Sequence, residues 1–337
     1  MSRTSTRLTM SILDLATVGE EQTATEALEA SVAVAQHAEA GGYKRVWYAE
    51  HHNVSSIASS APAVLIAHVA ARTTRIRVGA GGVMLPNHSP LVVAEQFGTL
   101  AALNPDRIDL GLGRAAGGDP ATWSALRRDP RSGESFLQDV LELQGYLRGE
   151  SLVEGVEAMP RADATVPLYI LGSSLFGARV AAALGLPYAF ASHFAPVALD
   201  AATALYRQEF RPSRQLEEPY VFASVNVFAA DSEVQARQEF EESLRTRVAF
   251  LLTGRRVVSD EDYRRLAASP QGRQVASMLA YAAVGTAQQV QQYLSAFARR
   301  ADADELVIVL ASFRSEGRLH SVDLVAEALD TRSPVVG

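Results

Sequence analysis

Short apolar runs alternate with longer segments of helical periodicity along almost the whole chain. Residues 8–13 form an apolar run that predicts a strand, and residues 25–40 carry apolar side chains at intervals of three and four until Gly41 and Gly42 end the predicted helix. The same pattern recurs along the rest of the chain. It predicts further strands at 45–49, 76–80, 107–112, 168–171, 188–191, 220–228 and 305–310, and helices at 61–72, 90–103, 135–147, 175–184, 199–210, 232–252, 286–298 and 322–329.

A chain in which strands and helices alternate builds a parallel sheet, because each helix carries the chain back to the start of the next strand. Eight predicted strands favour closure into a barrel over an open sheet. The 337 residues exceed the roughly 250 of a plain barrel, and no linker or internal repeat divides them. We therefore predict one α/β domain over residues 1–337, a single (β/α)8 TIM barrel with insertions after the fourth and seventh strands.

Two segments without clear periodicity predict where the insertions lie. After the fourth strand, residues 115–131 are rich in Gly, Pro and Asp, which predicts a loop. After the seventh strand, residues 255–274 are polar, which predicts a mobile segment at the surface.

Composition limits the partners and the location. The net charge is −7, and no basic patch alternates with aromatic residues, so nucleic acid is not an expected partner. The chain has no cysteine, which excludes disulfides, cysteine-ligated zinc and thiol catalysis, and suits a cytoplasmic protein. The first ten residues are a polar arm without a signal-peptide core, and no stretch approaches the roughly 20 apolar residues of a membrane helix. We expect no membrane association.

Polar residues and glycines gather directly after the predicted strands. In a (β/α)8 barrel the active site lies at these carboxyl ends, so the pattern locates the candidate chemistry. In chain order, the residues are Asp14, Glu50-His51-His52-Asn53, Gly81-Gly82 with Pro86-Asn87-His88, Arg114, Gly172-Ser173-Ser174, Ser192-His193 and Asn226.

His51 and His52 are the first candidates for acid–base chemistry, since the unperturbed pKa of histidine is about 6.5. Successive side chains of an extended segment point to opposite sides, so only one of the two should face the pocket. The alternative is that both histidines are structural. Glu50, His88 and His193 are also metal-ligand types, but the chain has no His-x-His pair of the kind that metal barrels use, so we expect no metal site.

Arg114 lies in the run Gly-Leu-Gly-Arg-Ala-Ala-Gly over residues 111–117, which contains a G-x-G-x-x-A pattern. A dinucleotide fingerprint would open a helix here, but Asp119-Pro120 and a loop follow, and no acidic residue ends the next strand. We therefore reject that interpretation. The small residues would instead let a flat ring approach the backbone, with Arg114 facing a polar ring edge or an anion. The alternative is a surface arginine.

Two further sites have a structural and a functional interpretation. Ser173 and Ser174 stand between a strand and a helix, where a hydroxyl can cap the helix or the free N–H groups can bind a phosphate. Gly177 would allow close approach on the first helical turn. Gly81 and Gly82 would open the backbone to a ligand, or form a bulge in the barrel.

Several motifs in sequence order resemble the bacterial luciferase-type flavin-dependent monooxygenases, over roughly residues 8–329. The likeness is greatest to a bacterial branch whose substrates are mostly unknown. The motifs are Val46-Trp47-Tyr48-Ala49-Glu50-His51-His52, residues 78–86 with Pro90 and Ala94-Glu95, residues 107–114, residues 168–174 with Gly185-Leu186-Pro187, and Val284-Gly285-Thr286.

The resemblance implies a role for each matching residue. His51 matches the catalytic histidine of the family. Gly81 and Gly82 match a pair joined by a non-prolyl cis peptide under the flavin ring. The remaining matches concern the cofactor: Arg114 contacts the flavin, Gly172, Ser173, Ser174 and Gly177 form the turn that binds its phosphate, and Ser192 lies near it.

The resemblance also implies the activity. We expect an FMN-dependent monooxygenase that uses reduced flavin and O2 to oxygenate a small organic substrate, with a separate flavin reductase supplying reduced FMN. His51 would handle protons, and residues 255–274 would close as a lid. The family forms dimers, and exposed helices of the second and third units could mediate a homodimer.

Three departures from luciferase itself argue against its aldehyde substrate and against light emission. Gly113 stands in place of a reactive cysteine, Ser173 in place of an acidic residue and His193 in place of a tryptophan. Three other functions remain open from the sequence: an oxidoreductase that uses the deazaflavin F420, a flavin-binding protein without turnover, and a metal-dependent hydrolase.

Overall fold

Eight parallel strands form a closed barrel in the computed structural model, which describes residues 8–19, 22–115, 120–160, 165–254 and 257–329. The first strand pairs with the last, and β6 pairs with β7, so the sheet has no open edge within the barrel. The prediction of a (β/α)8 TIM barrel is therefore confirmed. The barrel strands are β1 (Thr9–Asp14), β2 (Arg45–Tyr48), β3 (Arg77–Met84), β4 (Ile108–Gly113), β5 (Leu168–Gly172), β6 (Tyr188–Phe190), β7 (Val221–Ala229) and β9 (Glu305–Leu310).

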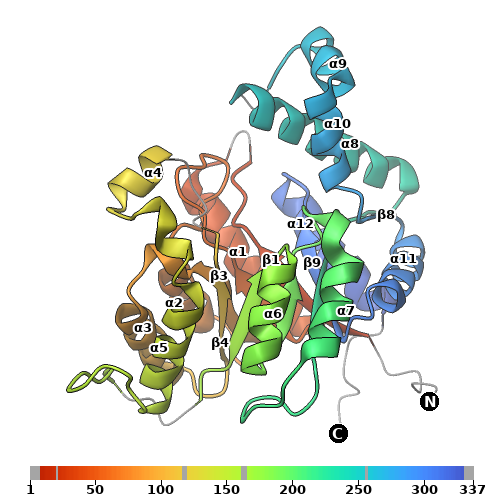
Figure 1. Cartoon of the computed structure of the whole chain (residues 1–337). Helices are drawn as coiled ribbons and strands as arrows, with labels where there is room; N and C mark the ends of the chain where they lie inside the picture. The colour runs from red at the N-terminus through yellow and green to blue at the C-terminus, as the bar shows by residue number, and fades with distance from the viewer. Residues whose placement is uncertain (1–7, 20–21, 116–119, 161–164, 255–256, 330–337) are drawn as a thin grey trace, which may run out of the picture.

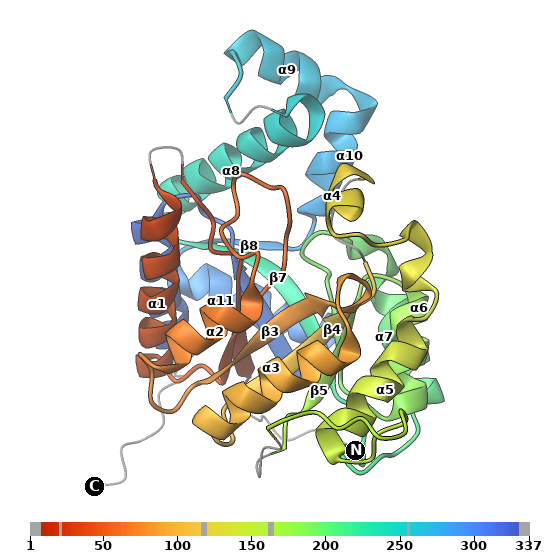
Figure 2. The same ribbon diagram turned by 90° about the vertical axis from the view of Figure 1, so that its left-hand side faces the viewer.

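Helices surround the barrel and cover the outward side chains of its strands (Figures 1 and 2). Most begin at a residue suited to a helix start; for example, Thr23 and Glu26 form a capping box at the first helix, with Thr23 accepting from the backbone of Glu26. The outer helices are α1 (Ala24–Ala40), α2 (Pro62–Ala70), α3 (Pro90–Leu103), α5 (Phe136–Arg148), α6 (Leu175–Leu184), α7 (Leu199–Glu209), α11 (Ala287–Arg300) and α12 (Ser315–Ala328).

The first insertion contains more structure than the sequence predicted. The segment expected as a loop holds the short helix α4 (Pro120–Ala125) and a 3-10 turn, Pro130–Gly133, that Asp129 caps by accepting from the backbone of Arg131. Residues 116–119 of that segment lie outside the described residues. Pro120 and Pro130 each stand at the first position of their element, where the missing N–H of proline does no harm.

The second insertion lies where it was predicted, but its polar segment forms two helices, which the sequence analysis did not predict. After α8 (Glu233–Thr253), the chain forms α9 (Asp260–Ala268) and α10 (Pro270–Met278). Ser259 and Ser269 cap them by accepting from backbone N–H groups three residues later. Residues 255–256 lie outside the described residues, as does the start of the N-terminal arm, residues 1–7. Figures 1 and 2 show α8, α9 and α10 projecting beyond one end of the barrel.

The structure differs from the sequence-based prediction in two further elements: it has a ninth strand, and its last helix begins earlier. The strand β8 (Ala282–Gly285) pairs in parallel with the C-terminal half of β7, outside the closed barrel. It was missed because its apolar run has only four residues, Ala-Ala-Val-Gly. The last helix, α12, begins at Ser315 rather than at residue 322. Among the described residues, no helix is both long enough and apolar enough to cross a bilayer.

The barrel interior is filled by aromatic side chains from different strands. Trp47, Tyr169 and Phe222 contact one another with ring centroids 5.0 to 5.6 Å apart. Aliphatic side chains such as Leu13 and Val309 complete this cluster. Such packing makes the interior a core rather than a channel, so a ligand can enter only at one of the barrel's ends.

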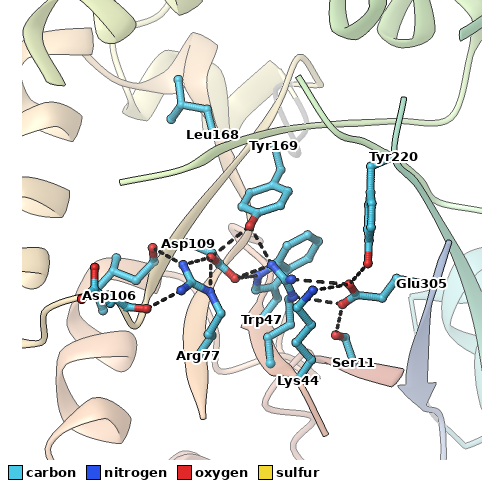
Figure 3. A network of polar contacts seen from close by, with 12 residues as sticks. Ser11, Lys44, Trp47, Arg77, Asp106, Asp109, Leu168, Tyr169, Tyr220 and Glu305 are labelled. Carbon is cyan, nitrogen blue, oxygen red and sulfur yellow. Dashed lines mark hydrogen bonds and ion pairs between the residues drawn. The ribbon is translucent and has the colours of Figure 1, made fainter. Parts of the chain in front are cut away.

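A buried ionic network closes the amino-terminal end of the barrel (Figure 3). The guanidinium of Arg45 lies 2.8 Å from a carboxylate oxygen of Asp109 and 2.9 Å from one of Glu305. Asp109 also accepts hydrogen bonds from Trp47 and Arg77. The four charged residues of the network, Arg45, Arg77, Asp109 and Glu305, are each the first or second residue of their strands, at the end opposite the candidate site, so the network serves the fold.

Candidate active site

A cavity of about 530 Å³ opens at the carboxyl ends of the strands, where the barrel fold was expected to hold its active site. Every barrel strand contributes at least one residue to its lining, and so do α8 and α10. Most of the lining is apolar, with a few polar groups. A cavity of this size and character matches sites that enclose a cofactor or a small organic ligand.

His51 lines the cavity, whereas His52 does not, which confirms that the two side chains point to different sides. The His51 backbone N–H donates to the carbonyl oxygen of Ser59 over 3.0 Å, which fixes the loop after β2. Nδ1 of His51 is buried and has no hydrogen-bond partner among the described residues. Burial lowers the pKa of His51, so the ring is neutral near pH 7.

Glu50 anchors the loops beside His51. Its carboxylate accepts hydrogen bonds from Nε2 of His52 and Nε2 of His88, both over 2.8 Å, and from the backbone N–H of Met84 over 3.0 Å. Burial would raise the pKa of Glu50, but these hydrogen bonds and the nearby His88 lower it overall. Glu50 is therefore a buried carboxylate with its oxygens satisfied. Among the described residues, no cluster of three or more ligand-type side chains could hold a metal ion.

The structure confirms the barrel irregularity expected at Gly81 and Gly82, while their contact with a ligand stays a prediction. Their peptide bond is cis, and both line the cavity. The pairing of β3 with β4 also shifts register here, so the pair forms an irregularity in the barrel. A Cβ on Gly81 would lie 2.8 Å from the Cβ of Trp47, and one on Gly82 would lie 2.6 Å from the carbonyl oxygen of Gly111. Barrel packing therefore requires both glycines, whatever ligand the cavity holds.

The turn between β5 and α6 presents polar groups to the cavity. Gly172, Ser173, Ser174 and Gly177 all line it. Ser174 is the N-cap residue of α6, but its side chain makes no capping hydrogen bond. The capping interpretation is therefore not realised in the structure. The first N–H groups of a helix without such a cap remain available to an anion, and the helix dipole favours its charge.

Arg114 lies beside the same turn. Its guanidinium carbon is 4.1 Å from the ring centroid of Phe176, on the first turn of α6, and both residues line the cavity. A guanidinium over an aromatic face at this distance is held by a cation–π interaction. The contact holds a positive charge against the first turn of α6, so this end of the cavity suits an anionic group.

Ser192, which the resemblance placed near the flavin, is not among the residues that line the cavity. The residue is fully buried, and its hydroxyl donates to the carbonyl oxygen of Ser224 over 2.5 Å. This hydrogen bond ties the end of β6 to β7. A serine after a strand can face a neighbouring strand as readily as the barrel axis, so a role for Ser192 near the flavin stays a prediction.

His193 and Arg247 are two lining residues to which the sequence analysis gave no role. His193 is 8% exposed, and its Nδ1 has no partner among the described residues. Burial, the charge of Arg247 and the nearby His51 together lower the pKa of His193 to about 3. Arg247 comes from α8, whose approach to the barrel mouth depends on tertiary packing. No pattern in residues 232–252 distinguishes this arginine from the others on the helix.

The fold and the cavity define a (β/α)8-barrel protein with its ligand site at the carboxyl ends of the strands. Its sequence matches the luciferase-like monooxygenase family over residues 8–304. The chain belongs to this family, as the sequence motifs around His51, Gly81 and Arg114 indicated.

Two relatives show how close the match is. A luciferase-like monooxygenase of Escherichia coli (strain K12) is 43% identical over 334 residues, which cover 98% of each chain. An N-acetyl-S-alkylcysteine monooxygenase of Bacillus subtilis (strain 168) is 36% identical over 242 residues, which cover 69% of this chain and 72% of the relative. The family membership supports an oxygenase activity.

Solved structures share the fold. The crystal structure of apo-MsnO8 has a TM-score of 0.87 and 34% identity, covering 97% of this chain and 100% of that one. Two other barrels have a TM-score of 0.70. The oxygenating constituent of 3,6-diketocamphane monooxygenase from Pseudomonas putida, in complex with FMN, is 16% identical and covers 96% and 97% of the two chains. An F420-dependent secondary alcohol dehydrogenase is 14% identical and covers 97% and 100%. These last two likenesses concern the fold alone.

Proposed function

We propose that the protein is an FMN-dependent monooxygenase, which uses reduced flavin and O2 to oxygenate a small organic substrate. The observation that carries the proposal is the turn at Ser173 and Ser174, which opens the uncapped end of α6 into the same cavity as His51 and the backbone of Gly81 and Gly82. An anion site and a proton-transfer group thus share one largely apolar chamber.

The residues present fit a phosphorylated, flat cofactor. Ser173, Ser174 and the first N–H groups of α6 would hold the phosphate, with Arg114 supplying the positive charge. The cis peptide of Gly81 and Gly82 presents backbone without side chains, where a ring can approach closely. When bound, the reduced flavin supplies the electrons that activate O2.

His51 is the residue that we assign to proton transfer. A neutral imidazole has one nitrogen that donates and one that accepts, so it can hold or release a proton near neutral pH. We assign the exchange to Nε2, because Nδ1 is buried without a partner among the described residues. The apolar lining, which includes Leu13, Val309 and Phe313, excludes water from the reacting groups.

The first substrates to test are thioethers that carry a carboxylate. The Bacillus subtilis relative is named as an N-acetyl-S-alkylcysteine monooxygenase, and the cysteine part of such a substrate has a carboxylate. Its sulfur is an oxygen acceptor, so transfer of one oxygen atom from O2 would give a sulfoxide, with the second oxygen atom reduced to water by the two electrons of the flavin.

Two partners remain proposals. A separate flavin reductase would supply reduced FMN, because the only glycine-rich fingerprint candidate in the sequence, around Arg114, is better explained as part of the flavin site. A homodimer is supported by exposed apolar side chains on α2 and α3, where Val64 is 70% and Leu103 is 72% exposed. We also propose that the protein is located in the cytoplasm.

An anaerobic titration tests the cofactor. Reduced FMN should bind. Ser174→Asp should weaken its binding about 10- to 100-fold, because the added carboxylate repels the phosphate and competes with it for the first N–H groups of α6. Asp is a good N-cap, so this variant should fold. Reduced riboflavin lacks the phosphate, and its binding should hardly change. Ala183→Asp, at an exposed position near the other end of α6, adds the same charge as a control.

The alternatives give different results in the same experiment. A deazaflavin enzyme would bind reduced F420 in preference to reduced FMN and would not consume O2. After air is admitted, His51→Ala should lose oxygen transfer to a thioether while keeping its affinity for reduced FMN. A flavin carrier would behave identically with and without His51. Activity that depends on an added metal ion and needs no flavin would favour the hydrolase.

A further inference from the structure

Arg247 is a cation in the cavity without a partner in the part of the chain that the structure describes. It lies on α8, lines the cavity, and makes no hydrogen bond or ion pair with any described residue. Two other arginines of the helix are paired: Arg237 lies 2.5 Å from Glu233, and Arg245 lies 2.6 Å from Asp260. The two arginines of α8 that lie outside the cavity therefore form ion pairs, whereas the one that lines the cavity forms none with any described residue.

No carboxylate of the described lining is available to Arg247. Glu50 is the only acidic side chain among the lining residues, and its oxygens already accept from His52, His88 and the backbone of Met84. Burial lowers the pKa of Arg247, and no charge among the described residues opposes that effect. A half-buried cation of this kind is stabilised once an anion from outside enters the cavity.

The surroundings of Arg247 show what kind of anion fits. Thr246 and Arg247 are adjacent polar residues, and Phe250 and Leu251 lie one turn further along the same face of α8. His193 is close enough for the charge of Arg247 to affect it. A planar guanidinium beside two hydrogen-bonding groups suits a carboxylate, and the aromatic and aliphatic side chains suit an apolar remainder.

The cofactor phosphate has its own site. Arg114 follows β4, and Ser173 and Ser174 lie between β5 and α6, whereas His193 follows β6 and Arg247 lies on the helix after β7. We infer that Arg247, with Thr246 and His193 beside it, binds the carboxylate of the substrate, whose remainder is apolar. This inference rests on the proposed function, because it takes the cavity to hold cofactor and substrate together.

The test uses matched pairs of probes in which a neutral amide replaces the carboxylate. Octanoate and octanamide, and phenylacetate and phenylacetamide, are added to the full-length protein in the presence of reduced FMN, and binding is measured by calorimetry. We expect the carboxylates to bind and the amides to bind at least about 10-fold more weakly. Arg247→Met should remove this difference, while Arg237→Met, in an exposed ion pair outside the cavity, should preserve it. Arg247→Lys keeps the positive charge but cannot donate the two parallel hydrogen bonds of a guanidinium. It should therefore bind carboxylates more tightly than Arg247→Met but more weakly than the unmodified protein.

The outcomes separate this inference from the proposed function. If no carboxylate binds, or if Arg247→Met binds carboxylates as well as the unmodified protein, the inference is wrong. If Arg247→Met instead loses its affinity for reduced FMN, the arginine belongs to the cofactor site, and the proposed function stands without the inference. If reduced FMN never binds but carboxylate binding still depends on Arg247, the anion site is real and the flavin assignment fails.

Discussion

The phenolic hydroxyl of Tyr188 donates a hydrogen bond of 3.0 Å to the carbonyl oxygen of Ser174. This bond joins β6 to the N-terminal end of α6, and the tyrosine is fully buried beneath the turn. The edge of the same ring lies next to Gly177, and Gly177 lies against Gly172. The turn that we assign to the phosphate is therefore positioned from below by a side chain that does not itself line the cavity.

The affinity for reduced FMN should respond to a single methyl group at Gly177. A Cβ there would lie 3.3 Å from Cε2 of Tyr188 and 3.5 Å from Cα of Gly172, so the first turn of α6 must shift by a few tenths of an ångström. We expect Gly177→Ala to bind reduced FMN about 10-fold more weakly in an anaerobic titration, since a shifted turn misaligns charged hydrogen bonds. Unchanged affinity in a variant with a normal unfolding midpoint would argue against a phosphate at this turn.

The sequence was sufficient for those parts of the fold and site that depend on local pattern. Eight apolar runs predicted the barrel strands. The rule that barrel sites follow the strands predicted that His51, Gly82, Arg114 and Ser174 lie together, and all four line one cavity. The insertion helix α9 was missed although Ser259 and three acidic residues after it are a helix-start signal. The polar composition of that segment was given more weight than its capping residues.

Other features depend on packing between distant segments, and no local pattern contains them. Arg247 faces the cavity only because α8 lies across the barrel mouth, and Ser192 turns to Ser224 only because β6 and β7 are neighbours. The ion pair of Arg45 with Asp109 joins residues 64 positions apart. Such contacts follow from closure of the barrel, which the sequence predicts as a class of fold but not in its side-chain detail.

The ionic network at the amino-terminal end should control stability. Asp109→Asn leaves the buried Arg45 and the partly buried Arg77 without their shared carboxylate, and breaking a buried pair in this way costs about 3–5 kcal/mol. The free energy of unfolding, measured with urea, should fall by that amount. Asp129→Asn removes the same charge from an exposed pair with Arg131 and should leave the urea midpoint unchanged. Equal effects of the two changes would contradict the role of the network.

Glu50 should set the pH dependence of turnover through His51. Burial lowers the pKa of His51, and the negative charge of Glu50 opposes that effect. Glu50→Gln removes the opposing charge, so the pKa of His51 should fall further and the acidic limb of the rate profile should move to lower pH. The profile is measured with saturating reduced FMN and a thioether substrate. A limb that moves to higher pH would show that another group controls it.

His193 should make the protein less stable as the pH falls below neutrality. Its pKa is about 6.5 when the chain is unfolded and about 3 in the fold, so between these values the unfolded chain binds a proton that the folded chain does not. Stability therefore rises with pH across this window and is greatest above it. At pH 5 the loss relative to pH 7 is on the order of 2 kcal/mol, because each unit of pH below the unfolded value costs about 1.36 kcal/mol.

Two variants test whether this loss belongs to His193. His193→Asn cannot take up the proton, so the free energy of unfolding, followed with urea from pH 7 to pH 5, should fall by less than in the unmodified protein. Arg247→Met should also reduce the loss, because the charge of Arg247 helps to lower the pKa of His193. His37→Asn is the control, since this partly exposed histidine lies on the outer helix α1 and pairs with Asp323, away from the cavity. The same loss in all four proteins would mean that His193 does not carry the pH dependence.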